Sequence, residues 1–460
     1  MPLKFVFGPS GSGKSTYLYQ HVIEESEKYP LKNFIVLVPE QFTMQTQKDL
    51  VSMHPRHGIM NIDVLSFARL AYRVFEETGT KQMQVLDDEG KNLILRKIAG
   101  DYENKLTVLK GNIKKLGYIS EVKSVISEFT QYDIGEEEID EMLDHLDEDS
   151  RLYYKLKDIR LLYEGFQDYL RERYITKEEL LDVLNSQVKE SELLKNSVVV
   201  LDGFTGFTPV QNRLILELMR CCKEVWVTVT MDERENPYAY KHPYQLFGLS
   251  KQMITTLVRM AGEDHIEVEE PVCLYGYPVK RFEKNQELAF LERNIFRYGS
   301  GRYDKAVENL EIHAAGNPRQ EADAVAEGIR RLVRKEQYRY RDIGVIVSDM
   351  NVYGDYLEQA FENYGIPVFM DHKRSILLNS FVEYIRRLLN MAEKNFSYES
   401  VFRFLRTNLA GFACEEVDEL ENYVLGLGIR GYKGWQNRWI RRLKGMEEEE
   451  LDRLNHYRVQ

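Results

Sequence analysis

The chain has 460 residues, of which 43% are hydrophobic and 30% charged, and its formal net charge is -12. This length predicts about three domains, and the negative charge argues against a histone-like binder of polyanions but leaves room for a local basic groove. No run approaches the roughly 18 apolar residues of a membrane span, and a core strand begins too early for a signal peptide. The four cysteines lack metal-ligand spacing, which indicates a cytoplasmic protein with reduced thiols.

The chain begins with a short apolar segment at residues 3–7, a glycine-rich loop, and a helical pattern over 16–27. The loop fits G-x-x-x-x-G-K-[ST], the phosphate-binding pattern of P-loop proteins, although a glycine-rich turn without a ligand is the alternative. Its backbone N–H groups would converge on phosphates, Lys14 would reach the β- and γ-phosphates, and Ser15 would offer a hydroxyl to Mg2+. The predicted site for ATP and Mg2+ comprises Gly8, Pro9, Ser10, Gly11, Ser12, Gly13, Lys14, Ser15 and Thr16.

Two further strand–helix units are predicted in the next sixty residues. Residues 34–38 and 61–65 are apolar runs, as expected for parallel strands that are covered on both faces. Three such units predict a doubly wound α/β sheet whose functional loops lie at the carboxyl ends of its strands.

The periodicity then changes over residues 83–195, where helical patterns dominate and no convincing strand occurs. We interpret this stretch as a helical insertion. Apolar strands at 197–202 and 224–230 resume the sheet, so residues 1–82 and 196–300 are predicted to form one α/β domain.

A second α/β domain is predicted to begin at residues 301–375. Its strands are expected at 309–313, 342–348 and 366–369, with helices between them. Residues 376–460 have helical patterns. Because the second sheet would have only about three strands before helices take over, we expect the chain to be a fragment.

Asp202 ends the strand that follows the insertion and is the natural acidic partner of the glycine-rich loop. In P-loop proteins such a residue holds Mg2+ opposite the loop serine, usually through water. The alternative is an aspartate that caps a turn before Gly203. We predict the metal role, with Ser15 and Asp202 as the Mg2+ residues.

Residues 202–211 resemble motif II of superfamily 1 helicases of the UvrD and RecB type, which reads D-E-F-Q-D-T-S-P-L-Q. Gly203 stands where that family has the glutamate that polarises the attacking water. Residues 342–348 look like helicase motif IV, whose arginine approaches the γ-phosphate, and here that position is Ser348. The resemblance therefore implies a P-loop, superfamily 1 helicase-like fold without intact catalytic residues, which binds ATP but has lost translocation. An active DNA-dependent ATPase, in which another residue positions the water, is the alternative.

In such helicases the loops after the second and third strands contact single-stranded DNA. The corresponding stretches here resemble motifs Ia and Ib, and their phenylalanines either stack on bases or belong to the core. The DNA-binding candidates are Phe42, Thr43, Ser66, Phe67 and Arg69. The adenine-stacking tyrosine of related helicases would be Tyr238, Tyr240 or Tyr244.

Basic side chains cluster at three places, and each cluster is more typical of a solvated helix face than of a binding site. We expect one of them to line a DNA channel. The clusters are Lys110, Lys114 and Lys115; Arg330, Arg331, Arg334 and Lys335; and Arg438, Arg441, Arg442 and Lys444.

Together, the loop F-G-x-S-G-S-G-K-[ST], V-P-E-Q-F-T at 38–43, S-F-A-R-L at 66–70 and D-G-F-x-x-F-T-P-x-Q at 202–211 resemble the AddB family of bacterial AddAB helicase–nucleases. This resemblance implies a heterodimer with an AddA-type subunit that processes DNA double-strand breaks for recombinational repair and recognises the Chi sequence in single-stranded DNA. It also implies a C-terminal nuclease domain with an iron–sulfur cluster. The nuclease carboxylates and clustered cysteines of that domain do not occur here, which implies an N-terminal portion. A small-molecule P-loop kinase and a scaffold with a vestigial nucleotide site are the remaining alternatives.

Overall fold

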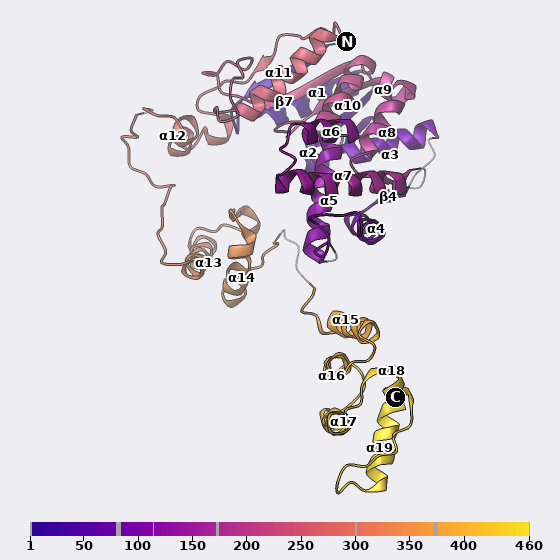
Figure 1. Ribbon diagram of the computed structural model, residues 1–460. Helices are drawn as coiled ribbons and strands as arrows, with labels where there is room; N and C mark the ends of the chain where they lie inside the picture. Colours follow the sequence, from indigo (N-terminus) through magenta and orange to yellow (C-terminus); the bar gives the residue numbers. More distant parts are fainter. Residues whose placement is uncertain are drawn as a thin grey trace. The chain divides into compact units, whose positions relative to one another are not determined.

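The computed structural model describes residues 2–79, 84–113, 115–171, 174–299, 301–370 and 376–459. It forms two compact units, residues 1–311 and 312–460, which are coloured along the chain in Figure 1. The domain boundaries predicted at 82, 300 and 375 lie outside the described residues. Within the described residues, no helix has both the length and the apolar character needed to cross a membrane.

The first unit is built on a six-stranded parallel sheet, which confirms the predicted α/β class. Its strand order is β3-β2-β6-β7-β1-β8, and every pairing is parallel. The last, very short strand was not predicted. The strands are β1 (Leu3–Gly8), β2 (Asn33–Leu37), β3 (Ile62–Leu65), β6 (Ser197–Leu201), β7 (Glu224–Thr230) and β8 (Val272–Cys273).

The central strands are buried on both faces, which is why their sequences are continuously apolar. In β6, Val199 and Leu201 point into the core on one face of the sheet, whereas Val198 and Val200 point into the core on the other. This alternation follows from the two-residue period of a strand. Helices cover both cores.

Helices on the two faces come from connections between strands. α1 contributes Leu18 and Val22 to one core, whereas α3, α10 and α11 contribute to the other. The bounds are α1 (Lys14–Lys28), α2 (Thr43–Met53), α3 (Phe67–Thr78), α10 (Pro209–Cys221), α11 (Gly248–Glu263) and α12 (Gln286–Asn294), with short 3-10 turns η1 (Glu40–Phe42) and η3 (Lys280–Phe282).

The stretch between β3 and β6 is helical, as predicted, and has a core of its own that includes Leu95, Ile113 and Phe166. The expectation that it lacks strands was wrong, because β4 (Gln84–Leu86) and β5 (Tyr174–Thr176) pair in parallel. Strands of three residues are too short to give a recognisable period. The helices are α4 (Asp88–Asp101), α5 (Leu116–Gln131), α6 (Glu136–Asp144), α7 (Arg151–Leu170), α8 (Leu180–Gln187) and α9 (Glu192–Lys195), with 3-10 turn η2 (Val188–Glu190).

The second unit begins with α13 (Pro318–Lys335) and α14 (Met350–Asn363), which pack on each other through Ala326 and Phe361. The strands expected at 309–313, 342–348 and 366–369 are not formed among the described residues. The 3-10 turn η4 (Tyr340–Asp342) ends on the first residue of the middle segment. A strand needs a neighbour to satisfy its N–H and C=O groups. Several apolar side chains of these segments, such as Ile346 and Phe369, are accordingly exposed, whereas Ile366 is buried against α13 and α14.

The chain continues as a group of helices, in agreement with the helical pattern of residues 376–460. Their core contains Phe402, Leu420, Tyr423 and Trp439. The helices are α15 (Ser380–Glu393), α16 (Tyr398–Leu405), α17 (Cys414–Leu427), α18 (Gly431–Gln436) and α19 (Glu448–Val459).

Candidate nucleotide-binding site

The glycine-rich loop connects the end of β1 to the first residue of α1. Gly11 and Gly13 have φ angles of 82° and 92°, a left-handed conformation that favours glycine. A Cβ atom added at Gly8 would lie 2.4 Å from the Oγ atom of Ser12, so a larger residue there would displace the loop. The three glycines are therefore needed for this path of the backbone.

The loop leaves hydrogen-bonding groups free for a ligand. α1 begins directly after Gly13, and no side chain of the described residues caps its first N–H groups. Uncapped N–H groups at a helix N-terminus form a site for anions. The Oγ atom of Ser12 is also buried, and none of the described residues forms a hydrogen bond with it. Both features fit a phosphate group.

Lys14 folds back over the loop that precedes it. Its Nζ atom donates hydrogen bonds of 2.9 Å to the carbonyl oxygen of Gly8 and 3.0 Å to that of Pro9. Burial lowers the pKa of Lys14 to about 8, an effect that the charge of Arg281 reinforces and that of Asp202 opposes. At neutral pH the side chain is therefore still mostly protonated and available to a phosphate.

Asp202 follows β6 and is 5% exposed, with β7 lying between its strand and β1. Its Oδ1 atom accepts hydrogen bonds from the hydroxyls of Ser15 (3.1 Å) and Thr228 (2.6 Å), and its Oδ2 atom accepts one from Tyr19 (2.7 Å). Burial and the charge of Asp202 raise the pKa of Tyr19, which keeps that hydroxyl protonated. These donors stabilise a carboxylate that would be costly to bury alone. Because Mg2+ prefers oxygen ligands, the Ser15 hydroxyl and the Asp202 carboxylate fit that ion.

Two basic residues that sequence reasoning missed, Lys280 and Arg281, line the cleft above the loop. The backbone N–H of Arg281 donates to the carbonyl oxygen of Gly11 at 3.0 Å. Asp202 and Gly203 line the same cleft, whose volume of about 470 Å³ is in the range of small-molecule sites. The adjacent Lys-Arg pair was a signal in the sequence, but β8, which brings it here, was not predicted.

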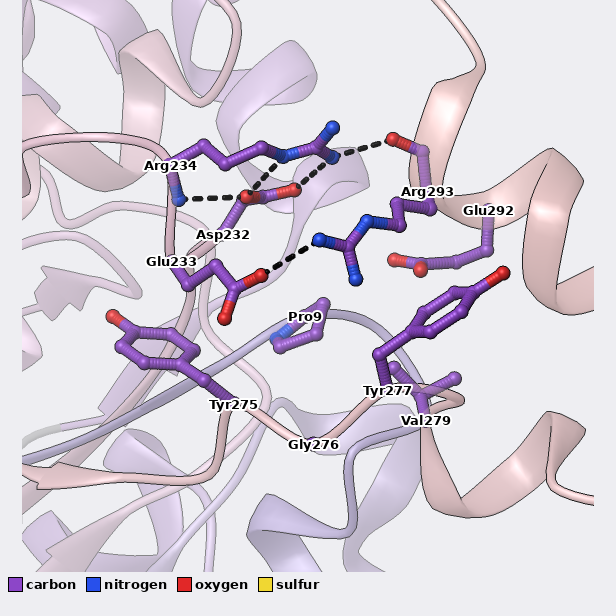
Figure 2. Close-up of a pocket in the computed structure, with 10 residues that line it drawn as sticks. All are labelled: Pro9, Asp232, Glu233, Arg234, Tyr275, Gly276, Tyr277, Val279, Glu292 and Arg293. Atoms are coloured by element: carbon purple, nitrogen blue, oxygen red, sulfur yellow. Dashed lines mark hydrogen bonds and ion pairs between the residues drawn. The ribbon is translucent and has the colours of Figure 1, made fainter. Parts of the chain in front are cut away.

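A small hollow beside Pro9 is lined by the segment that follows β7 and by α12 (Figure 2). Arg293 of α12 pairs with Glu233 at 3.0 Å, and its guanidinium lies 4.4 Å from the ring centre of Tyr277. Arg234 pairs with Asp232 at 2.7 Å and thereby lowers the pKa of that carboxyl to about 2. The free volume of about 20 Å³ is too small for a nucleoside. These contacts tie the segment after β7 to α12.

Other predicted nucleotide-site residues have different surroundings. Gly203 has a φ angle of 80°, again a conformation that favours glycine. Ser348 belongs to the second unit. Among the described residues that line the cleft, none is one of the three candidate tyrosines. Tyr238 contacts Phe7 edge-on, and Tyr244 stacks on His242.

The predicted DNA-binding residues follow β2 and β3 and divide into exposed and buried ones. Phe42 is 48% exposed, and Arg69 is exposed without a carboxylate partner among the described residues. Phe67, by contrast, is buried and packs on Phe204 and Phe207, so it belongs to the core. The remaining two are buried and serve local structure: the Thr43 hydroxyl donates to Glu40, and Ser66 caps α3.

The six-stranded parallel sheet, with a glycine-rich loop that faces a buried aspartate at one edge, makes this an α/β protein with a helicase-like fold. The chain belongs to the family described as "ADDB, N-terminal", whose model matches residues 5–292. It is 44% identical to the B-type subunit of the ATP-dependent helicase/deoxyribonuclease of Lachnoclostridium phytofermentans, covering 100% of this chain and 40% of that protein. The proteins of the same name from Caldanaerobacter subterraneus and Clostridium acetobutylicum are 36% and 32% identical, over 99% of this chain and 39% and 40% of theirs. The chain thus spans about 40% of the length of these relatives.

Proposed function

We propose that this chain is the ATP-binding, helicase-like part of a subunit in a complex that processes DNA double-strand breaks for recombinational repair. The observation that carries the proposal is the pairing of Ser15 with buried Asp202 below an uncapped, glycine-rich helix start. The relatives are named as subunits of a helicase/deoxyribonuclease, and these names support the DNA-processing role. The complex would include an AddA-type partner subunit, and nuclease activity would reside outside this chain.

In the proposed site, the triphosphate lies on the N-terminus of α1, with Lys14 and Arg281 opposing its negative charge. Ser15 and Asp202 would hold Mg2+, which when bound neutralises phosphate charge. With Gly203 in place of a water-positioning glutamate, we propose that ATP maintains a conformation rather than drives translocation. Arg281 favours a second candidate, residual ATP hydrolysis, because a cation beside the phosphates is one part of a hydrolytic site.

We further propose that single-stranded DNA is bound by the loops after β2 and β3, with Phe42 and Arg69 as its main contacts. Phe42 offers a ring for base stacking and Arg69 a cation for phosphates. By family resemblance, the sequence bound there would be Chi.

Nucleotide titration and steady-state ATPase assays on the purified chain test this proposal. We expect Mg2+-dependent binding of a fluorescent ATP analogue that Lys14→Ala abolishes, and turnover that single-stranded DNA does not increase. Equal affinity in wild type and Lys14→Ala would instead indicate a vestigial site. DNA-stimulated turnover of several ATP per second would establish a motor and overturn the conformational role of ATP.

A further inference from the structure

The last of the three basic clusters lies in a segment of unusual charge, residues 430–444, which we call the basic segment. It contains no aspartate or glutamate, although the chain as a whole has an excess of acidic residues. It comprises α18 and the irregular chain that leads to α19 (Figure 1). Its cations are Arg430, Lys433, Arg438, Arg441, Arg442 and Lys444.

The backbone of the basic segment is fixed to the helical core at several points. Trp439 is 6% exposed; its ring nitrogen donates to Gly434, and its backbone exchanges two hydrogen bonds of 2.9 Å with the Asn455 side chain. The buried Tyr423 donates a hydrogen bond of 2.6 Å to the carbonyl oxygen of Arg441. Leu443 packs over Gly426, where an added Cβ would lie only 2.8 Å from it. An irregular segment is thereby held in one conformation.

The cations between these anchors are exposed. Arg438 pairs with Asp452 at 2.9 Å. For Arg441, Arg442 and Lys444 there is no carboxylate partner within residues 376–459 or elsewhere in the described chain. Unpaired cations on a fixed backbone keep their charge available to an anionic partner, and the arginine fork matches phosphate oxygens.

The other two clusters differ. Lys114 lies outside the described residues, and Lys115 donates to Asn112 in its own turn. On α13, Arg330 donates to Tyr340. The basic segment is therefore the cluster with the most cations left for a ligand.

We propose that the basic segment binds the phosphate backbone of double-stranded DNA, separately from the single-strand site near β2 and β3. This inference rests on the proposed DNA-processing function. Duplex DNA is favoured over a single strand because both tryptophan rings of the segment, Trp435 and Trp439, are packed on each other. The only other ring of the segment, that of Tyr432, is half exposed and lies against Phe396 on one side. Single-strand sites depend on free rings for stacking, whereas phosphate contacts need only cations.

Fluorescence anisotropy with a short labelled duplex and an oligo(dT) strand tests the proposal on the full chain. The variant Arg441→Ala/Arg442→Ala/Lys444→Ala is expected to lose about eightfold in duplex affinity per lost contact at about 0.1 M salt. The slope of the logarithm of duplex affinity against the logarithm of salt concentration is expected to become less steep by up to about 2.7. Oligo(dT) affinity is expected to change less than about twofold, because the single-strand site is intact.

The control Arg334→Ala/Lys335→Ala/Lys394→Ala removes the same net charge from exposed positions of the same unit. This control variant should retain duplex affinity. The variant Arg441→Lys/Arg442→Lys, which preserves the positive charge, should also retain it. Circular dichroism checks that each variant folds. Unchanged duplex affinity in the first variant, or an equal loss in the control, overturns this inference. The proposed function is tested separately by oligo(dT) binding, which upholds it even when the inference fails. Polyglutamate competing as well as DNA indicates an acidic protein partner and also overturns it. No binding of either DNA form overturns both proposals.

Discussion

The hydroxyl of Tyr19 donates a hydrogen bond of 2.7 Å to the Oδ2 atom of Asp202, across 183 residues of the chain. Tyr19 lies on α1, one turn beyond the nucleotide-binding loop, and Asp202 directly follows β6. This bond fixes the aspartate through the same helix that would bind the phosphates. It also leaves Oδ1 facing Ser15, where Mg2+ would bind.

Tyr19→Phe is therefore expected to weaken both stability and Mg2+-dependent nucleotide binding. Loss of a hydrogen bond to a buried charged group costs about 1–3 kcal/mol. Urea unfolding and nucleotide titration with and without Mg2+ measure the two effects. Tyr17→Phe is the matched control, because it removes a hydroxyl from the same helix that forms no hydrogen bond with any of the described residues. Equal losses in both variants would contradict a specific role for Tyr19.

Nucleotide affinity is expected to fall as the pH rises through about 8. The pKa of Lys14 is lowered to about 8 because burial disfavours its ammonium form. Phosphates bind the charged form of Lys14, so nucleotide affinity is at its maximum below pH 8. Above pH 8 the affinity declines, because Lys14 must take up a proton when the nucleotide binds. Calorimetry in two buffers of different ionisation enthalpy measures this uptake. In Lys14→Arg, whose side chain stays charged, the decline should disappear; a decline that persists would assign it to another group.

Arg281→Ala should weaken the binding of ATP and raise the pH at which nucleotide affinity declines. Removing a charged contact to phosphate costs about 1.5–3 kcal/mol, which is roughly 10- to 100-fold in affinity. Because the charge of Arg281 helps lower the pKa of Lys14, the midpoint of the pH curve should also rise. Arg281→Lys should keep most of both properties. Wild-type affinity in Arg281→Ala would exclude a phosphate contact.

Gly203→Glu is expected not to create a DNA-stimulated ATPase, even though it restores the residue of active helicases. Gly203 has a φ angle of 80°, and an ordinary residue in that conformation costs about 1–2 kcal/mol. The added side chain has room, since the nearest atom to a Cβ there is 3.7 Å away. Thermal unfolding should show the modest loss, and steady-state assays should show no gain. A large gain in turnover would mean that the missing carboxylate alone silences the site.

Phe42→Ala and Phe67→Ala should have opposite consequences. Phe67 is buried against Phe204, so its truncation should destabilise the first unit by about 3–5 kcal/mol. Phe42 is half exposed, and its truncation should leave stability within about 0.5 kcal/mol while weakening single-stranded DNA binding by about 1–3 kcal/mol. Chemical unfolding and anisotropy with oligo(dT) separate the two. Unchanged DNA affinity in Phe42→Ala would remove it from the proposed interface.

The segments at 3–7, 34–38 and 197–202 are mostly apolar, which by itself predicted buried strands, and they correspond to β1, β2 and β6. The glycines and Lys14 likewise predicted the loop, because few backbones other than a phosphate-binding turn require that spacing. These features are local, because the period of a strand and the backbone conformations open to glycine depend on residues that are close together in the chain.

What needed the tertiary structure are contacts between distant segments. Nothing near Tyr19 or Thr228 in the sequence indicates that both donate to Asp202, and β8, which brings Arg281 to the loop, is too short to have a period. The same reason explains the errors: the apolar runs at 342–348 and 366–369 have strand-like composition, but composition does not supply a neighbouring strand. Apolar patterning in a sequence determines which side chains can be buried. The partners of backbone N–H and C=O groups and of charged side chains are determined only when the chain folds.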